Sequence, residues 1–350
     1  MLQESLHHIL LEKAPLVPML CFIINASDDE TNEDEEHAKY IFDCAVVAMS
    51  CVAQVQAFRM NIVGEGGVQA LVKSIMDGKI LSAEVAGEIV RTFTLISYED
   101  KAIMPLVDSH IFLALHILYR KGFLTPETGE MIGLLLRNVA INPKTHTKLV
   151  DSGAFLLFRA LCEPLTDKSV AFARAVTIVA SEIGASDELH EAIVEQGIIA
   201  LLHQVVLPCS VDDTSKYTEL FPVKPGSSYA ALALDLKYAE LAKARKQNSL
   251  AISRVDTRRI TEALHSLSTT PPTRIAIVDA EYAEIVRKLL STGNVDHDSM
   301  LFIAKCAKNL SSSKVCRQKL VDTGVVEILL EITRTSMKYS KDNDGANVNV

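Results

Sequence analysis

The sequence predicts an all-α protein, arranged as a right-handed α-solenoid, and three observations support this prediction. Aromatic residues make up only 5% of the chain and Trp is absent, so Leu, Ala, Val and Ile must fill the core, as they do between stacked helices. The apolar residues, 49% of the total, are spread evenly over 350 positions, and no hydrophilic linker divides them. Finally, one short phrase recurs at a nearly constant interval, which indicates a repeat array.

The recurring phrase reads (Ile/Leu)-Val-x-x-Gly. Its fifth position falls on Gly66, His110, Gly153, Gly197, Glu281 and Gly324. Successive copies are 43 or 44 positions apart, except for one interval of 84 positions that corresponds to two periods. A period in the low forties is typical of solenoids with two or three helices per repeat, and the chain is long enough for about seven to eight units.

Each unit is expected to contain three helices. A short first helix ends at the phrase, where Gly can take the positive φ that a tight junction needs. His110 replaces Gly at one junction, and His enters the left-handed region more readily than most residues. A second helix follows at once, and a third begins after a polar turn. Thr125 illustrates that turn, because its hydroxyl can cap a helix over 125–141 with Pro126 in the first position.

The N-terminal part begins with an apolar run over 14–26. This run is too short to span a bilayer and lacks the basic lead-in of a signal peptide, so we expect it to form the second helix of the first repeat. Residues 27–36 follow with seven acidic side chains and are expected to form a solvated loop. A helix over 37–56 is expected next.

The C-terminal half contains one interruption. Residues 208–228 hold three prolines and are expected to form an inserted loop. A long helix over 229–252 and another over 254–268 should then resume the repeat phase. We therefore expect a single solenoid over 1–336, followed by a polar tail, residues 337–350, for which disorder is the default expectation.

Two copies carry a fuller motif. Residues 136–143 read LRNVAINP and are followed by LVDSGA at 149–154, while residues 308–311 with 320–325 match less closely. This pattern resembles the armadillo repeat, and the resemblance covers roughly residues 38–336; HEAT repeats are the nearest competitor. The resemblance implies that the third helices line a concave groove, which holds an extended or helical segment of another protein.

In that family the groove-facing position, which Asn138 and Asn309 occupy here, is Asn in binders of extended peptides. The equivalent residues in the other copies are Cys51, Leu95, Glu182 and Ser266. The nuclear-import adaptors also carry Trp one turn earlier, which this chain lacks, so that ligand class is disfavoured. The candidate partner-binding residues are Arg91, Leu134, Arg137, Asn138, Ile178, Glu182, Lys305, Lys308 and Asn309. The alternative for the two Asn residues is that they satisfy backbone carbonyls inside the stack.

A cluster of bases stands out in an otherwise acidic chain. This basic patch comprises Lys243, Arg245, Lys246, Arg254, Arg258 and Arg259. It could bind an acidic peptide, a phosphate or a tubulin-like surface. The alternative is an ordinary solvated helix face with acidic neighbours.

Composition and motifs also exclude several functions. A net charge of −9 disfavours nucleic acid as a partner. The chain has no H-E-x-x-H, no G-x-S-x-G and no phosphate-binding loop, so we expect no catalytic residues, no metal, no cofactor and no small-molecule substrate. The seven cysteines are an odd number without C-x-x-C, which favours a reducing compartment and a cytoplasmic location.

The sequence therefore predicts a non-enzymatic scaffold or adaptor that binds a protein partner through its concave face. A structural cytoskeletal or axonemal component, held by its outer faces and loops, is the alternative function.

Overall fold

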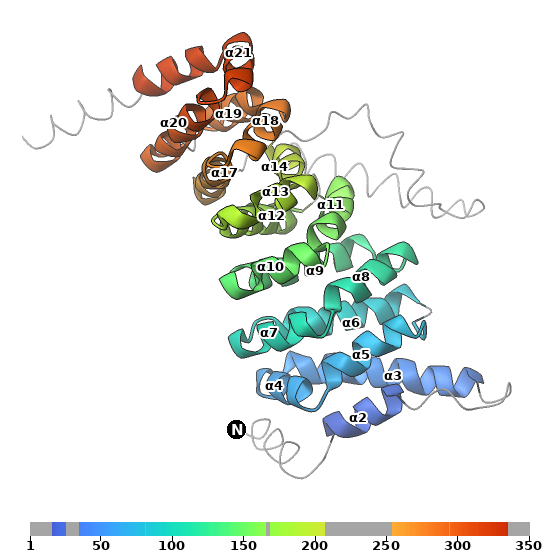
Figure 1. The fold of residues 1–350 in the computed structure, drawn as a ribbon. Helices are drawn as coiled ribbons and strands as arrows, with labels where there is room; N and C mark the ends of the chain where they lie inside the picture. Colours follow the sequence, from blue (N-terminus) through green and yellow to red (C-terminus); the bar gives the residue numbers. More distant parts are fainter. Residues whose placement is uncertain are drawn as a thin grey trace, which may run out of the picture. The chain divides into compact units, whose positions relative to one another are not determined.

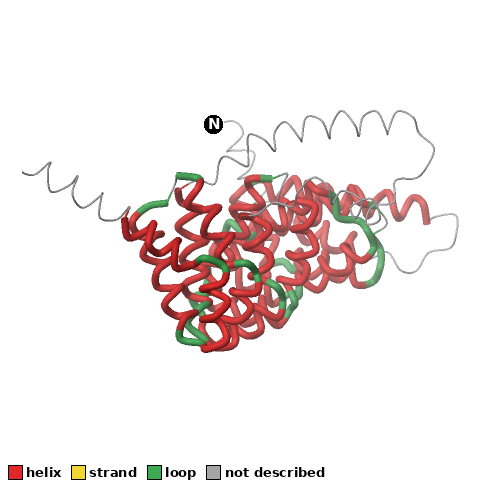
Figure 2. The backbone as a smooth tube through the Cα atoms, turned by 90° about the horizontal axis from the view of Figure 1, so that it is seen from above, coloured by secondary structure: helices red, strands yellow, loops and turns green. Residues whose placement is uncertain are grey.

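The structure, a computed structural model, describes residues 16–25, 35–80, 82–165, 169–206, 254–293 and 295–334. These residues form helices and loops and contain no strand, so the predicted all-α class is confirmed for them (Figure 2). The expected insert over 208–228, the helix over 229–252 and the tail over 337–350 lie outside the described residues. The chain forms two compact units, Met1–Leu161 and Cys162–Val350. The single solenoid over 1–336 remains a prediction.

The first unit stacks three-helix repeats. Its helices are α2 (Leu16–Asn25), α3 (Glu35–Gln54), α4 (Gln56–Gly64), α5 (Gly67–Met76), α6 (Ala83–Ile96), α7 (Asp100–Asp108), α8 (Ile111–Arg120), α9 (Pro126–Ala140), α10 (His146–Asp151) and the start of α11 (Ala154–Leu165). The third helices α3, α6 and α9 pack in sequence, as do the second helices α2, α5 and α8 (Figure 1). The apolar run near the N-terminus is thus the second helix of the first repeat, as predicted.

The second unit repeats this arrangement. Its helices are the end of α11, then α12 (Val170–Ile183), α13 (His190–Glu195), α14 (Ile198–Val206), α17 (Arg254–Leu267), α18 (Pro271–Asp279), α19 (Tyr282–Ser291), α20 (His297–Ser311), α21 (Lys314–Asp322) and a last helical stretch over 325–334. The third helices α12, α17 and α20 form one layer, while α13, α18 and α21 form the layer of first helices. The three-helix repeat is therefore present in both units.

Two boundaries differ from the prediction. The helix expected over 37–56 begins at Glu35 and ends at Gln54, because Val55 has an extended backbone and α4 starts immediately after it. Glu35 and Glu36 thus lie in the first helical turn rather than in the acidic loop. The acidic side chain of Glu36, at this end of the helix, interacts favourably with the helix dipole.

Four of the third helices, α6, α9, α12 and α20, begin at side-chain caps. The capping residues, each accepting a hydrogen bond from the backbone N–H three positions later, are Ser82, Thr125, Ser169 and Asp296. Caps of this kind stabilise a helix by about 1 kcal/mol, since they satisfy one of the free N–H groups of the first turn.

The junctions between first and second helices have the expected conformation. Positive φ values from 67° to 89° occur at the phrase glycines Gly66, Gly153, Gly197 and Gly324. His110 and Glu281, which replace Gly in two copies, adopt the same conformation with φ of 60° and 58°. The chain therefore keeps the junction geometry even where the sequence loses Gly.

A recurring contact closes four of the turns from a third helix into the next first helix. A side chain seven positions before the fifth residue of the phrase donates a hydrogen bond of 2.7–3.0 Å to the carbonyl six residues before itself. The donors are Arg59, His146, His190 and Arg274. Each bond satisfies one of the carbonyls that the C-terminus of a helix leaves free.

Several contacts join neighbouring repeats at the end of the second unit. Between the third helices α17 and α20, Asn309 Nδ2 donates to Ser268 Oγ at 2.9 Å. Between the first helices α18 and α21, Lys319 pairs with Asp279. The Arg287 guanidinium, on the second helix α19, donates to the Thr323 carbonyl that follows α21. At the turn, Arg274 Nη1 donates to Ser312 Oγ at 2.7 Å. The core inside these layers contains Tyr282, whose hydroxyl donates to the Ile303 carbonyl at 2.9 Å.

Candidate protein-binding face

The candidate site lies on the third helices of the second unit. We call the partly exposed polar side chains of α12, α17 and α20 the third-helix face of this unit. Its members are Glu182, Arg258, Arg259, Glu262, Lys305, Lys308 and Asn309. Four of them were candidate partner-binding residues and two belonged to the basic patch, so the fold brings two separate sequence predictions onto one surface.

A depression of about 520 Å³ opens on this face between α12 and α17. Its lining residues are Ser181, Glu182, Ala185, Arg258, Arg259, Glu262 and Asp296. It is polar and carries both signs of charge, with three carboxylates and two guanidinium groups. This composition suits a segment that presents both donors and acceptors.

Charged contacts connect the three helices across the depression. Arg259 pairs with Glu182 at 3.2 Å, and Arg258 pairs with Asp298 at 3.1 Å. The Ser181 hydroxyl donates to Glu262 Oε2 at 3.2 Å. The side chains of Arg259 and Glu182 are 33% and 35% exposed, and ion pairs of this kind contribute only about 0–1 kcal/mol. A bound segment can therefore replace one partner at small cost.

Two rings stack on each other between α17 and α20. His265 stacks on Phe302, with ring centroids 5.8 Å apart, and Lys305 Nζ lies 5.8 Å from the centroid of the same ring. Burial lowers the pKa of His265, and the positive charge of Lys305 lowers it further, whereas Glu262 acts in the opposite direction. His265 is therefore neutral near pH 7 and offers an uncharged ring to this part of the face.

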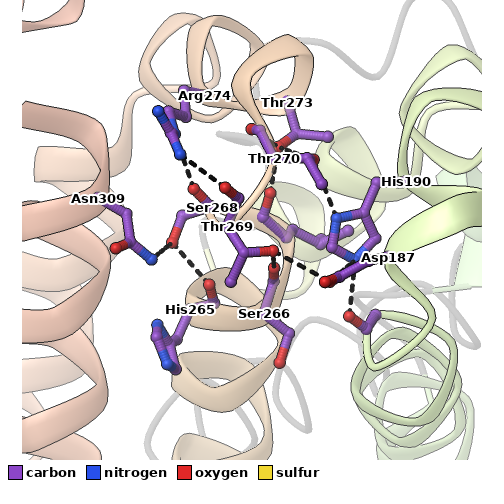
Figure 3. Close-up of polar contacts among 12 residues, drawn as sticks. Asp187, His190, His265, Ser266, Ser268, Thr269, Thr270, Thr273, Arg274 and Asn309 are labelled. Carbon is purple, nitrogen blue, oxygen red and sulfur yellow. Dashed lines mark hydrogen bonds and ion pairs between the residues drawn. The ribbon is translucent and has the colours of Figure 1, made fainter. Parts of the chain in front are cut away.

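Asn309 differs from Asn138 in what its amide can still bind. Asn309 is half-buried, and its Nδ2 donates to Ser268 Oγ at 2.9 Å (Figure 3). Asn138 is 8% exposed; its Nδ2 donates to Ser97 Oγ at 2.9 Å, and its Oδ1 accepts from the Arg137 guanidinium at 2.9 and 3.2 Å. Both Asn residues thus bond a hydroxyl of the preceding repeat rather than the backbone carbonyls considered from sequence.

A polar network joins the turns that follow α12 and α17. His190 is 1% exposed and contacts the Gly184 carbonyl at 2.8 Å and Thr270 Oγ1 at 3.0 Å. Thr269 Oγ1 donates to Asp187 Oδ1 at 3.1 Å. Figure 3 shows these side chains between the ends of the third helices, with Asn309 on the opposite side of Ser268. The network fixes the spacing of α12 and α17, and hence of their charges.

On the corresponding face of the first unit, the polar candidates already have internal contacts. Arg91 pairs with Glu88 on its own helix at 3.1 Å, and Glu88 accepts a 2.5 Å hydrogen bond from Ser50. Leu134 is half-buried beside the Arg137–Asn138 contact. These residues share one surface within their unit, although each polar group already has an internal contact.

The remaining candidates have mixed positions. Ile178 is half-buried on α12, and Lys305 and Lys308 are exposed on α20. Of the basic patch, Arg258 and Arg259 are on α17, Arg254 begins that helix, and Lys243, Arg245 and Lys246 lie outside the described residues. Whether any of these residues binds a partner remains a prediction.

Sequence reasoning missed the serines that hold the two Asn residues. Ser97 and Ser268 each precede their Asn by 41 positions. Both serines occupy the same position in their repeats. The signal in the sequence is that the two repeats with Asn at the groove-facing position each follow a repeat with Ser at this position. The sequence reasoning also missed Phe302 and Asp298, which no motif singles out.

Other site types have little support in the part of the chain that the structure describes. No group of three His, Cys, Asp or Glu side chains there is arranged to hold a metal ion. No single described helix is long and apolar enough to cross a membrane. α7 and α8 together have enough length and few enough charges, but the pair is bent by 63°.

Comparisons with known proteins identify the fold. No protein-family model and no curated protein matches the chain. An engineered protein of known crystal structure aligns with 85% of this chain and 96% of its own, at 20% identity and a TM-score of 0.51. Two designed armadillo repeat proteins, one in complex with the peptide (KR)4, each align with 84% of this chain and 99% of their own, at 14% identity and TM-scores of 0.52 and 0.51. The chain therefore has an armadillo-like repeat fold.

Proposed function

We propose that this armadillo-like chain is a non-enzymatic scaffold that holds a segment of a partner protein on the third-helix face of its second unit. The observation that supports this most directly is the polar depression between α12 and α17, which two cross-helix ion pairs border. Side chains from three successive repeats meet there, so an extended segment crossing them would contact all three.

The chemistry of the face favours a polypeptide of mixed charge. Arg259, Arg258 and Lys305 provide donors, and Glu182 and Glu262 provide acceptors, within one surface. Asn309 Oδ1 adds an acceptor beyond its bond to Ser268. The designed neighbour that is in complex with (KR)4 supports a peptide as the class of ligand, although its own ligand carries only positive charge.

A charge exchange tests the proposal. The double variant Glu182→Arg with Arg259→Glu keeps an opposite-charge pair between α12 and α17 but reverses what each helix presents. The matched control, Asp279→Lys with Lys319→Asp, reverses an exposed pair on the first helices, away from the third-helix face.

Each chain is used as bait in a native extract, and captured proteins are quantified by mass spectrometry. We expect partners captured by the wild type to fall by at least about tenfold with the Glu182/Arg259 exchange, which corresponds to roughly 1.4 kcal/mol, and to persist with the control. The reverse pattern would instead support a structural component held by its outer faces. Equal capture by all three baits would exclude both binding modes at these pairs.

A further inference from the structure

The end of the second unit presents an apolar groove. Its volume is about 550 Å³, and it lies between α20, α21 and the helical stretch over 325–334. The apolar side chains that line it include Ala307, Leu320, Val321, Val325, Val326 and Leu329. This surface is separate from the depression on the third-helix face, which α12 and α17 form.

The repeat register shows what normally covers such a surface. One repeat earlier, α20 packs on α17 and α18 and accepts the hydrogen bond of Tyr282 from α19. Val278 and Ala283, which precede Val321 and Val326 by one period, are 8% and 4% exposed under that cover. Val321 and Val326 are 58% and 48% exposed. The groove therefore has the lining that a third helix covers one repeat earlier, and no residue that the structure describes covers it here.

The 16 residues that follow 334 do not have the sequence of that helix. One period after the buried positions of α20 that hold Ser299, Met300, Ile303, Cys306 and Ala307, the sequence has Asp342, Asn343, Ala346, Asn349 and Val350. Asp and Asn are unfavourable in a helix interior, and they would have to be buried in this register. Residues 335–350 are therefore a poor match for a covering helix in this register.

The rim of the groove indicates the charge of that helix. Lys308 and Arg317 line it, and neither side chain has a hydrogen bond or ion pair with any residue that the structure describes. Arg274, one period before Arg317, donates to Ser312 at the C-terminal end of α20. Arg317 is therefore placed to bind the C-terminal end of a covering helix, where free carbonyls and acidic side chains attract a cation.

We propose that this end groove binds an amphipathic α-helix of another protein. The helix has the length of one third helix, about four turns. Its apolar face fits Val321, Val326 and Leu329, and acidic residues flank that face opposite Lys308 and Arg317. This interaction uses a different surface from the depression between α12 and α17 and does not depend on it, although Lys308 belongs both to the rim of the groove and to the third-helix face.

The test uses three helix-stabilised synthetic peptides of 15 residues, the length of α20. One has Leu, Ile and Ala at the spacing of the buried positions of α20 and Glu on the flanks. The second has Lys in place of Glu, and the third has the composition of the first in scrambled order. Binding to the full chain is measured by fluorescence anisotropy.

Val326→Asp is the test variant, and Val315→Asp on α21 is its control, because Val315 is 64% exposed and does not line the groove. Both replace an exposed side chain, so both should fold. We expect the acidic peptide to bind the wild type and Val315→Asp equally, and Val326→Asp at least about tenfold more weakly. Lys308→Glu with Arg317→Glu should reverse the preference to the basic peptide.

Three results would overturn the proposal. One is equal binding of the scrambled peptide, and another is an equal loss with Val315→Asp. The third is a wild-type dimer in sedimentation equilibrium that Val326→Asp dissociates and Val315→Asp does not, because the groove would then hold a second copy of this chain.

Discussion

Asn309 Nδ2 lies 2.9 Å from Ser268 Oγ, and Asn138 Nδ2 lies the same distance from Ser97 Oγ, so one contact joins adjacent third helices in both units. In each case the Ser hydroxyl also donates to a carbonyl three residues earlier in its own helix. The Ser is thus held in place by its own helix when it accepts from the Asn. In both units, the Asn of the armadillo-like motif therefore links neighbouring repeats.

The first prediction concerns the energy of this link. Asn309→Ala and Ser268→Ala should each lower the free energy of unfolding by about 1–2 kcal/mol, since each leaves a polar group without its partner. The double variant should cost less than the sum of the two, with a coupling of about 0.5–1.5 kcal/mol. Urea unfolding of the four proteins gives this cycle; additive losses would mean that the two side chains act independently.

The second prediction concerns His110. Its φ of 60° is in the left-handed region, where a Cβ costs about 1 kcal/mol. His110→Gly should therefore raise the melting temperature, whereas Gly153→Ala, at φ 67°, should lower it. Gly64→Ala is the control, because Gly64 lacks a positive φ and an added Cβ meets nothing within 4 Å. A lower melting temperature for His110→Gly would show that the imidazole contributes more than the conformation costs.

The third prediction concerns alkaline pH. Burial raises the pKa of the Cys306 thiol from its ordinary value of 9.0 to about 12. A group whose pKa is raised by folding stabilises the folded state fully below its unfolded pKa, and this contribution is lost as pH rises through the folded value. Unfolding free energy should thus fall between pH 9 and 12.

Cys306→Ala should make that fall shallower, which urea unfolding at pH 8, 9 and 10 would measure. Cys44→Ala serves as the control, because Cys44 is exposed and its removal should leave the slope unchanged. An unchanged slope in Cys306→Ala would assign the alkaline sensitivity to other groups, of which Tyr282 is the nearest candidate, because burial also raises its pKa.

The fourth prediction compares two phenylalanines. Phe93 is fully buried in the first unit, and Phe22 is 74% exposed on α2. Phe93→Ala should lower the free energy of unfolding by about 3–5 kcal/mol through lost burial and the cavity left behind. Phe22→Ala should change it by less than about 0.5 kcal/mol. A large loss at Phe22 would indicate that residues outside the described part cover its ring.

The sequence predicted the repeat architecture because the phrase marks a backbone requirement. A left-handed residue at each junction fixes the period, and His110 and Glu281 could be placed there although neither is Gly. The boundary at Val55 was missed because one extended residue between two helices leaves no break in the apolar pattern. Helix propensity alone does not identify such a position.

The candidate site was predicted less completely. Glu182, Lys305 and Asn309 could be placed on third helices by counting from the phrase. Several contacts of this face join neighbouring repeats, such as Arg258 with Asp298 and Asn309 with Ser268. Such contacts depend on the separation of neighbouring helices, which the period of a sequence does not contain. For the same reason the sequence leaves both roles of Asn138 open, internal link and ligand contact.

The links at the end of the second unit have a mechanical consequence. Lys319 joins α21 to α18, and Arg287 on α19 holds the Thr323 carbonyl that follows α21, so a force that pulls α21 away from the unit loads both bonds at once. The contact between Asn309 and Ser268 joins α20 to α17 and is loaded separately. Bonds loaded in parallel share the force, whereas bonds loaded one after another fail singly. α21 should therefore detach from α18 and α19 in one step.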